Sequence, residues 1–224
     1  MTTFVAVFLF GCGQSVDQGN ALDNTPSQNS LTETSTEEQD TEEPDAHQEA
    51  SEEESASNVS DALSELHVHF MDVGQADATL FQYADNGEDY TILFDAGDWN
   101  KSDVVHYLSS ENIDTIDLII ISHPHADHIG QLDQIMTQFE VDEVWMSGNT
   151  TSSSTFQHAL ESVLASDANY YEPQSGDTFD IGSLEIEVLH PEKLTGKLNE
   201  DSISARMTYG DISFLFTGDA LQND

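Results

Sequence analysis

The sequence predicts an α/β fold with β-sheets in its middle layers. Strand-like and helix-like segments are mixed along residues 66–224, which is typical of layered α/β proteins. Within this region, residues 116–122 (IDLIIIS) form an apolar run, the pattern of a strand that is buried on both faces. The region is about 160 residues long, which is enough for one domain with a substantial core.

Three strands and a helix are predicted before that buried strand. Residues 66–73 (LHVHFMDV) alternate as a strand does, and after the turn GQAD the segment 78–83 forms a second strand. Residues 90–97 (YTILFDAG) form a third apolar strand that ends at a glycine. Residues 102–110 have helical spacing, with their apolar side chains on one side.

Helices and strands are also predicted after the buried strand. They are a helix at 129–139, a strand at 143–147, a helix at 155–165, a turn and alternating strand within 179–191, and a hairpin over 203–219 that turns at Gly210 and Asp211.

The segment before the domain, residues 13–65, is predicted to be a disordered acidic tether. Runs such as TETSTEEQDTEEPD contain no basic residue and almost no large apolar ones. Such a segment cannot bury enough apolar surface to offset the entropy lost on ordering. Like charges along it favour extended conformations.

Residues 1–12 (MTTFVAVFLFGC) are an apolar run that ends at Cys12, the only cysteine. The run is too short to span a bilayer, which takes about 20 residues. Its end, LFGC, resembles a lipobox, in which the cysteine is lipidated and becomes the mature N-terminus. This predicts a lipoprotein anchored to the membrane through Cys12 at the extracellular face, or a secreted protein; the alternative is a frayed apolar N-terminus with a buried free thiol.

The chain is extremely acidic, with 44 Asp and Glu residues against 4 Lys and Arg and a formal net charge of −40. Self-repulsion of this size destabilises a compact state and is relieved when salt screens it, which suggests a salt-rich, halophilic setting. Nucleic-acid-binding proteins usually carry a basic stripe. Any contact with DNA would therefore depend on metal ions or high salt.

Residues 121–132 (ISHPHADHIGQL) contain the strongest chemical signal in the sequence. Three histidines and an aspartate fall within six residues, directly after the predicted buried strand. The end of such a strand is where α/β sheets place ligand sites. Imidazoles and carboxylates are donors that zinc prefers. The spacing H-x-H-x-D-H lets two groups of ligands face two neighbouring points, so the sequence predicts a metal site here.

With this motif, the chain resembles the metallo-β-lactamase superfamily of metal-dependent hydrolases. Within it, the likeness is to the hydrolase domain of ComEC-type DNA-uptake competence proteins, through FMDVGQADATL, ILFDAGD, ISHPHADHIGQL, NEDSIS and FLFTGDA. The resemblance covers essentially all of residues 66–224. It implies an αββα sandwich, in which two sheets pack together with helices outside.

The resemblance also implies a site with two divalent ions, Zn²⁺ or Mn²⁺. Carried over to this sequence, His123 and His125 bind one ion, and Asp127 and His128 bind the other. Asp219 of the TGD segment matches the aspartate that bridges both. The ions would activate a water molecule as hydroxide for attack. Asp127 is the residue to which we assign a catalytic role.

The family pattern is not met at two places. A third histidine ligand usually follows the strand predicted at 184–189. Here His190 lies slightly too early, and Asp201 in NEDS is an oxygen donor that would shift preference toward manganese. We leave open which of the two substitutes. The family's last histidine lies beyond the bridging aspartate, so the domain is expected to be C-terminally truncated.

Other polar residues have expected supporting roles. Asp72, Gln75, Asp77 and Asp95 are expected either to order loops near the metal ions or to be plain turn residues. Trp99 either lines a substrate mouth or caps the core. The resulting prediction is an extracellular metal-dependent hydrolase of a phosphodiester, with DNA a candidate. The alternatives are a hydrolase of another ester, and a non-catalytic metal-binding or recognition module.

Overall fold

The computed structural model describes residues 63–220. The described residues all belong to one compact unit. The predicted signal segment 1–12, with Cys12, and nearly all of the predicted tether 13–65 lie outside the described residues. The lipid anchor and the disordered tether therefore stay predictions.

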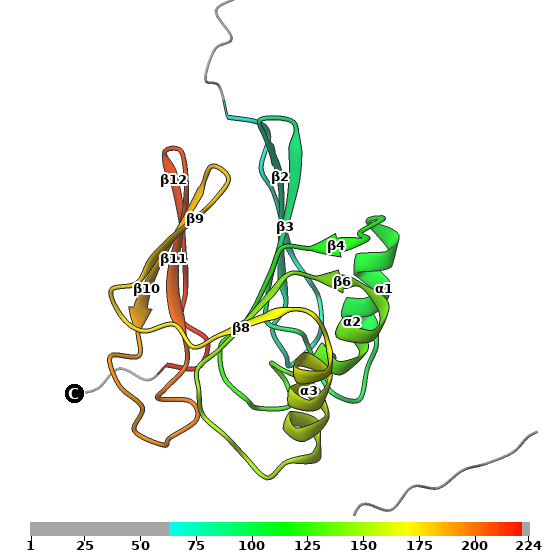
Figure 1. The fold of residues 1–224 in the computed structure, drawn as a ribbon, viewed down its shortest axis with the longest axis vertical. Coiled ribbons are helices and arrows are strands. Elements are labelled where there is room, and N and C mark those ends of the chain that lie inside the picture. The colour runs from blue at the N-terminus through cyan, green and yellow to red at the C-terminus, as the bar shows by residue number, and fades with distance from the viewer. Residues whose placement is uncertain (1–62, 221–224) are drawn as a thin grey trace, which may run out of the picture. The chain divides into compact units, whose positions relative to one another are not determined.

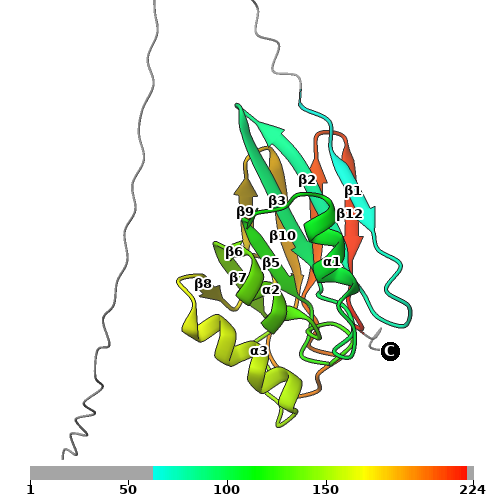
Figure 2. The same ribbon diagram turned by 90° about the vertical axis from the view of Figure 1, so that its right-hand side faces the viewer.

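The larger of two main sheets has six strands in the order β1-β2-β3-β5-β7-β8 (Figures 1 and 2). Strands β1, β2 and β3 pair antiparallel, whereas β3, β5, β7 and β8 pair parallel. The strands are β1 (His67–Phe70), β2 (Thr79–Asp85), β3 (Glu88–Phe94), β5 (Leu118–Ile121), β7 (Glu143–Met146) and β8 (Asn169–Tyr171).

The second sheet is antiparallel and has four strands in the order β12-β11-β10-β9. They are β9 (Thr178–Ile181), β10 (Leu184–His190), β11 (Ser204–Tyr209) and β12 (Ile212–Phe216). A separate pair of short parallel strands consists of β4 (Thr115–Ile116) and β6 (Glu140–Val141).

Three helices, α1 (Asp103–Ser110), α2 (Leu132–Gln138) and α3 (Ser154–Ala165), lie on the face of the larger sheet that points away from the second sheet (Figure 1). Two apolar cores hold the layers together. One packs Leu93 and Ile119 of the sheet against the helices, for example against Leu108. The other packs the opposite sheet face, including Ile120, against β10 and β11, for example Ile186.

The predicted double-sided burial of the apolar run is confirmed along β5. Ile119 and Ile121 face the helices, while Leu118 and Ile120 face the second sheet. All four are almost fully buried. Since successive side chains of a strand point to opposite faces, only an unbroken apolar sequence can satisfy both layers.

The predicted α/β class is confirmed, and the boundaries differ in places. The run 116–122 divides into β4 and β5 at Asp117, whose carboxylate accepts a hydrogen bond from the Thr91 N–H at 2.7 Å. Strands β6 and β8 were not predicted, and β9 occupies residues where a turn was expected. Among residues 63–220 the helices cover only the larger sheet, and none of these helices is long and apolar enough to cross a membrane.

Candidate metal centre

The ends of three strands meet at one edge of the sandwich. Asp95 follows β3, Ser122 and His123 follow β5, and Asp219 comes shortly after β12. Because parallel strands end at the same edge of a sheet, β3 and β5 deliver their loops to one place. The second sheet brings the end of β12 to the same place. The Ile203 N–H, just before β11, donates to the Ser122 carbonyl at 2.8 Å, and β11 pairs with β12.

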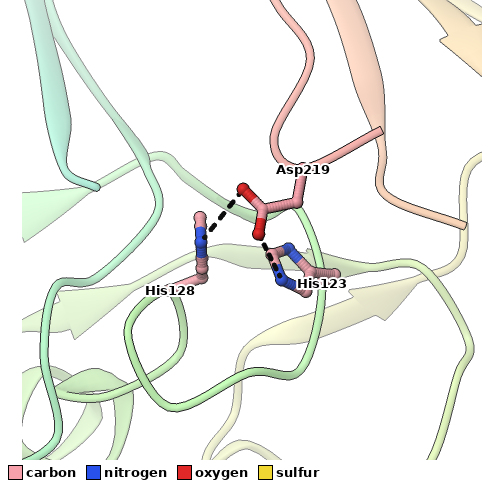
Figure 3. A group of neighbouring side chains, drawn as sticks. All are labelled: His123, His128 and Asp219. Carbon is pink, nitrogen blue, oxygen red and sulfur yellow. Dashed lines mark ion pairs between the residues drawn. The ribbon is translucent and has the colours of Figure 1, made fainter. Parts of the chain in front are cut away.

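The two oxygens of Asp219 face two different histidines (Figure 3). One oxygen, Oδ2, lies 3.7 Å from His123 Nε2, and the other, Oδ1, lies 3.6 Å from His128 Nε2. The His123 Nε2 atom is also 2.9 Å from His125 Nδ1. A carboxylate with one oxygen turned to each imidazole is the arrangement expected of a bridging ligand.

His128 is held in place by Asp95. Its Nδ1 atom lies 2.9 Å from Asp95 Oδ2, and Asp95 also accepts hydrogen bonds from the N–H and the hydroxyl of Ser122 at 2.7 and 2.9 Å. Asp95 has a left-handed backbone with φ of 61°, which is uncommon for a residue other than glycine. These bonds keep His128 Nε2 turned toward Asp219.

Glycine is required at position 130 for the histidine loop to close. A Cβ atom there would lie 2.2 Å from the Trp99 N atom and 2.4 Å from the Ala126 carbonyl oxygen. The Trp99 N–H donates to that same carbonyl at 3.0 Å. The loop after β3 is therefore packed directly on the H-x-H-x-D-H segment.

The histidines have opposite electrostatic surroundings. Burial, together with the charges of His128 and His125, lowers the pKa of His123 to about 3, so His123 is neutral at neutral pH. Burial alone would lower the pKa of His128, but the hydrogen bond and charge of Asp95, with the charges of Asp127 and Asp219, raise it to about 9.

Asp95 and His128 form a carboxylate–imidazolium pair at neutral pH. Burial raises the pKa of Asp95, while the hydrogen bonds from His128 and Ser122 oppose that rise. The pKa values of both partners are thus shifted upward, and one proton lies between them. We place this proton on His128, because the N–H and hydroxyl of Ser122 both donate to Asp95 and so favour its ionised form.

The residues present fit a divalent cation. Ligand atoms of His123, His128 and Asp219 all lie within 4.8 Å of one another, and so do those of Asp77, Asp95 and His128. Two ligand atoms that are each about 2 Å from one tetrahedral ion lie about 3.3 Å apart. The 3.6 and 3.7 Å separations around Asp219 are close to that value.

The predicted ligands are thus brought together unevenly. His123, His128 and Asp219 form one group, and His125 adjoins it through His123. Asp127 is half-buried and belongs to neither group of ligand atoms, although its charge contributes to the raised pKa of His128. Its roles as ligand and catalytic residue stay predictions.

Of the four residues that were expected to order loops near the metal ions, two lie beside His128 and the other two are exposed. Asp95 is fully buried and holds His128, and the Asp77 carboxylate lies 3.7 Å from His128 Nδ1 while remaining mostly exposed. Asp72 and Gln75 are exposed. Trp99 is 58% exposed, so its side chain does not cap the core.

His190 and Asp201 make other contacts than the predicted ligand ones. His190 Nε2 lies 2.6 Å from the Glu200 carbonyl oxygen. The buried Asp201 carboxylate accepts hydrogen bonds from Asn149, Thr195 and Gly196. Although burial opposes them, these bonds lower the pKa of Asp201 below its ordinary value. Both side chains fix the loop 191–201 and lie outside the two groups of ligand atoms.

Sequence reasoning missed three residues around the site. Ser122 bonds Asp95 and approaches both His123 and His128, Ser202 accepts from the Asp219 N–H, and Asn199 Nδ2 donates to Asp219 Oδ2 at 3.2 Å. All three residues lie within the segments ISHPHADH and NEDSIS, so closeness in sequence to the histidines or to Asp201 was the available signal.

Residues 71–224 match the family model of the metallo-beta-lactamase superfamily. The chain belongs to the metallo-beta-lactamase superfamily. This membership confirms the family predicted from the motifs and agrees with the mixed α/β architecture. Members of the superfamily are typically metal-dependent hydrolases that bind divalent ions such as zinc.

The curated relatives of this superfamily member include proteins of two kinds. Anaerobic nitric oxide reductase flavorubredoxin of Pectobacterium atrosepticum is 27% identical over 125 residues, which cover 52% of this chain and 24% of the relative. ComE operon protein 3 of Bacillus subtilis is 24% identical over 175 residues, which cover 70% of this chain and 22% of the relative. The chain therefore spans about a quarter of the length of these curated relatives.

Solved structures of metallo-beta-lactamase proteins also match. The metallo-beta-lactamase fold protein YhfI from Bacillus subtilis matches with a TM-score of 0.42 at 21% identity. The match covers 69% of this chain and 60% of the YhfI chain. A metallo-beta-lactamase from Staphylococcus aureus has a TM-score of 0.45 at 17% identity and covers 70% of this chain and 44% of its own.

Proposed function

We propose that this chain is a hydrolase that uses two divalent metal ions, Zn²⁺ or Mn²⁺, to cleave a phosphodiester, with DNA a candidate substrate. The observation that carries the proposal is the position of Asp219, which turns one carboxylate oxygen to His123 and the other to His128. Such a carboxylate is suited to join two neighbouring cations, which is the arrangement that two-metal hydrolysis uses.

Each residue of the site has a role in this proposal. His123 and His125 would hold one cation, His128 and Asp127 would hold the second, and Asp219 would serve as a ligand to both. Cations held there supply Lewis-acid chemistry and lower the pKa of water. In hydrolysis, the water oxygen forms a bond to phosphorus, the bond to the leaving alkoxide breaks, and a proton of the water goes to that alkoxide. Asp127 is the carboxylate that we propose takes up and passes on this proton.

The proposed substrate class is supported by the resemblance to competence-type hydrolase domains. The match to ComE operon protein 3 extends over 175 residues, against 125 for the flavorubredoxin. The formal net charge of −40 opposes tight binding of a polyanion, so contact with DNA would rely on the cations of the site and on salt. A small phosphodiester would meet a lower electrostatic barrier.

Metal content and turnover test the proposal together. We expect the purified full chain to bind two equivalents of zinc or manganese and to hydrolyse bis(p-nitrophenyl) phosphate. His125→Ala should abolish turnover, whereas His158→Ala, at an exposed position on α3, should leave it unchanged. Two equivalents with turnover of carboxylic esters only would indicate another ester as substrate.

Two further outcomes would contradict the proposal. One equivalent of metal or none, without turnover of any ester, would indicate a non-catalytic binding module. Nitric oxide reductase activity without turnover of any ester would instead place the function of the chain with that of the flavorubredoxins.

The location of the enzyme is a separate proposal. We propose that a lipid on Cys12 anchors it at the extracellular face of the membrane and that the acidic segment 13–65 holds the domain away from the surface. Expression with radiolabelled palmitate tests this. Label in the wild-type chain that is lost in Cys12→Ser supports the anchor, and an unlabelled wild-type chain contradicts it.

A further inference from the structure

The loop between β10 and β11 is fixed at both of its ends, and this decides which of its side chains reaches the site. At one end His190 is bonded to the Glu200 carbonyl at 2.6 Å. At the other end the Asp201 carboxylate accepts from the Thr195 N–H and hydroxyl at 2.9 and 2.8 Å and from the Gly196 N–H at 2.8 Å. The side chains of His190 and Asp201 organise the loop through these hydrogen bonds. Neither belongs to the groups of possible metal-ligand atoms around His123 and His128.

Asn199 is the side chain of this loop that contacts a predicted ligand. Its Nδ2 atom donates to Asp219 Oδ2 at 3.2 Å, and this is the same oxygen that lies 3.7 Å from His123 Nε2. Its backbone is tied in as well. Ser202 donates its hydroxyl to the Asn199 carbonyl at 2.8 Å and accepts from the Asp219 N–H at 3.2 Å.

We propose that Asn199 is a metal ligand and supplies, through its amide oxygen, the donor that a third histidine would otherwise give to the cation shared by His123 and Asp219. This inference rests on the proposed metal-dependent function. The carboxamide of Asn199 offers both a donor, which holds Asp219 in the metal-free protein, and a neutral oxygen that can bind a cation.

The chemistry of the amide predicts which ions the site prefers. Replacing an imidazole by a carbonyl oxygen makes the ligand set harder, and harder sets favour Mn²⁺ over Zn²⁺ relative to a three-histidine site. An amide also adds no negative charge. A carboxylate at the same position would lie beside Asp219 and repel it whenever the cation is absent.

Metal titration of four full-length proteins tests the inference. The metal-free wild type, Asn199→Ala, Asn199→Asp and Asn199→His are titrated with Mn²⁺ and with Zn²⁺ by calorimetry, and the Mn²⁺ complexes are followed by electron paramagnetic resonance. We expect Asn199→Ala to weaken Mn²⁺ binding by at least about tenfold. Asn199→Asp should retain Mn²⁺ binding, and Asn199→His should shift the preference toward Zn²⁺. Asn169→Ala, at an exposed position on β8, is the matched control and should bind both ions as the wild type does.

The outcomes separate this inference from the proposed function. If Asn199→Ala binds both ions as the wild type does, or if the three variants all weaken binding equally, Asn199 is not a ligand, while the hydrolase proposal stands. If the wild-type chain itself binds neither ion, both fail. Circular dichroism of each metal-free variant shows whether the domain has folded. Should Asn199→Ala fail to fold, the ratio of Zn²⁺ to Mn²⁺ affinity in Asn199→His against the wild type decides, and an unchanged ratio overturns the inference.

Discussion

Asp95→Asn is the substitution that most directly tests the electrostatics of the site. The asparagine side chain has nearly the same shape as aspartate, and asparagine tolerates the left-handed backbone that Asp95 adopts at φ of 61°. What changes is the charge beside His128 Nδ1, 2.9 Å away. The side chains of Asp95 and His128 are almost fully buried, so solvent screens their interaction little.

The expected magnitude follows from the pKa of His128. It is raised from 6.5 to about 9 in the folded, metal-free protein, with Asp95 as the largest contribution that raises it. At about 1.4 kcal/mol for each pH unit, this difference corresponds to about 3 kcal/mol. Since the folded pKa is the higher one, the stabilisation is complete below pH 6.5 and is lost as the pH rises through about 9.

The assay is urea unfolding of the metal-free protein, prepared with a chelator, at several pH values in high salt. We expect the free energy of unfolding of the wild type to fall by about 3 kcal/mol across this window, and that of Asp95→Asn to stay nearly level. The measured quantity is the slope of the unfolding free energy with pH, and not its value at one pH. Burial of the charged Asp95 carboxylate costs free energy, as the raised pKa shows, and Asp95→Asn recovers part of that cost at every pH in the window. His123 does not interfere, since its pKa of about 3 confines its effect to more acidic solutions.

The control is Asp77→Asn. Its carboxylate lies 3.7 Å from the same nitrogen but its side chain is 66% exposed, so we expect a slope close to that of the wild type. A wild type whose stability does not change across the window, or an Asp95→Asn variant that loses stability as steeply, would refute the assignment of a carboxylate–imidazolium pair.

Three further predictions concern the loop, the metal and the surface charge. Gly130→Ala places a Cβ atom 2.2 Å from the Trp99 N atom and should cost about 3 kcal/mol of unfolding free energy. Gly87→Ala, with φ of 88° and no atom within 4 Å of the added Cβ, should cost about 1 kcal/mol. Equal costs in urea unfolding would show that the histidine loop moves to accommodate the added Cβ. Metal binding at neutral pH should release about one proton from His128, measured by calorimetry in buffers of different ionisation enthalpy, and no release would contradict its raised pKa. The urea midpoint should rise as salt is added because salt screens the net charge of −40, and a midpoint independent of salt would exclude self-repulsion as a limit on stability.

The sequence predicted the fold where the hydrophobic pattern was unambiguous. The run around β5 supplies apolar residues alternately to two layers, two to each, and the hairpin of β11 and β12 turns at Gly210 as expected. The pattern could not show β6 and β8, which are two and three residues long, and it indicated a turn at the four residues of β9. The predicted helix at 129–139 begins only at Leu132, because the residues before it close the histidine loop through bonds such as Ile129 N–H to the His125 carbonyl.

For the site, composition and spacing indicated which residues carry donor atoms but not which of these donors are free. His123, His128 and Asp219 were predicted together and lie together, although 91 residues separate His128 from Asp219 in sequence. Asp201 was an equally plausible oxygen donor in sequence. Its carboxylate is occupied by the N–H groups of its own loop, and Asn199, two residues earlier, makes the contact to Asp219 instead. Such a distinction depends on how the loop folds, which no spacing rule encodes.

The arrangement of charges explains why a site like this would bind cations before it accepts an anionic substrate. Asp77, Asp127 and Asp219 all lie near His128, whose single positive charge cannot neutralise them together with Asp95. The remaining negative potential favours a divalent cation and repels a phosphate, in a protein that is already at −40. Asp95 and Ser122 meanwhile hold His128 in position without a metal, so little ordering is needed when a cation binds. For the proposed hydrolysis of an anionic substrate, we therefore expect the cation to bind first.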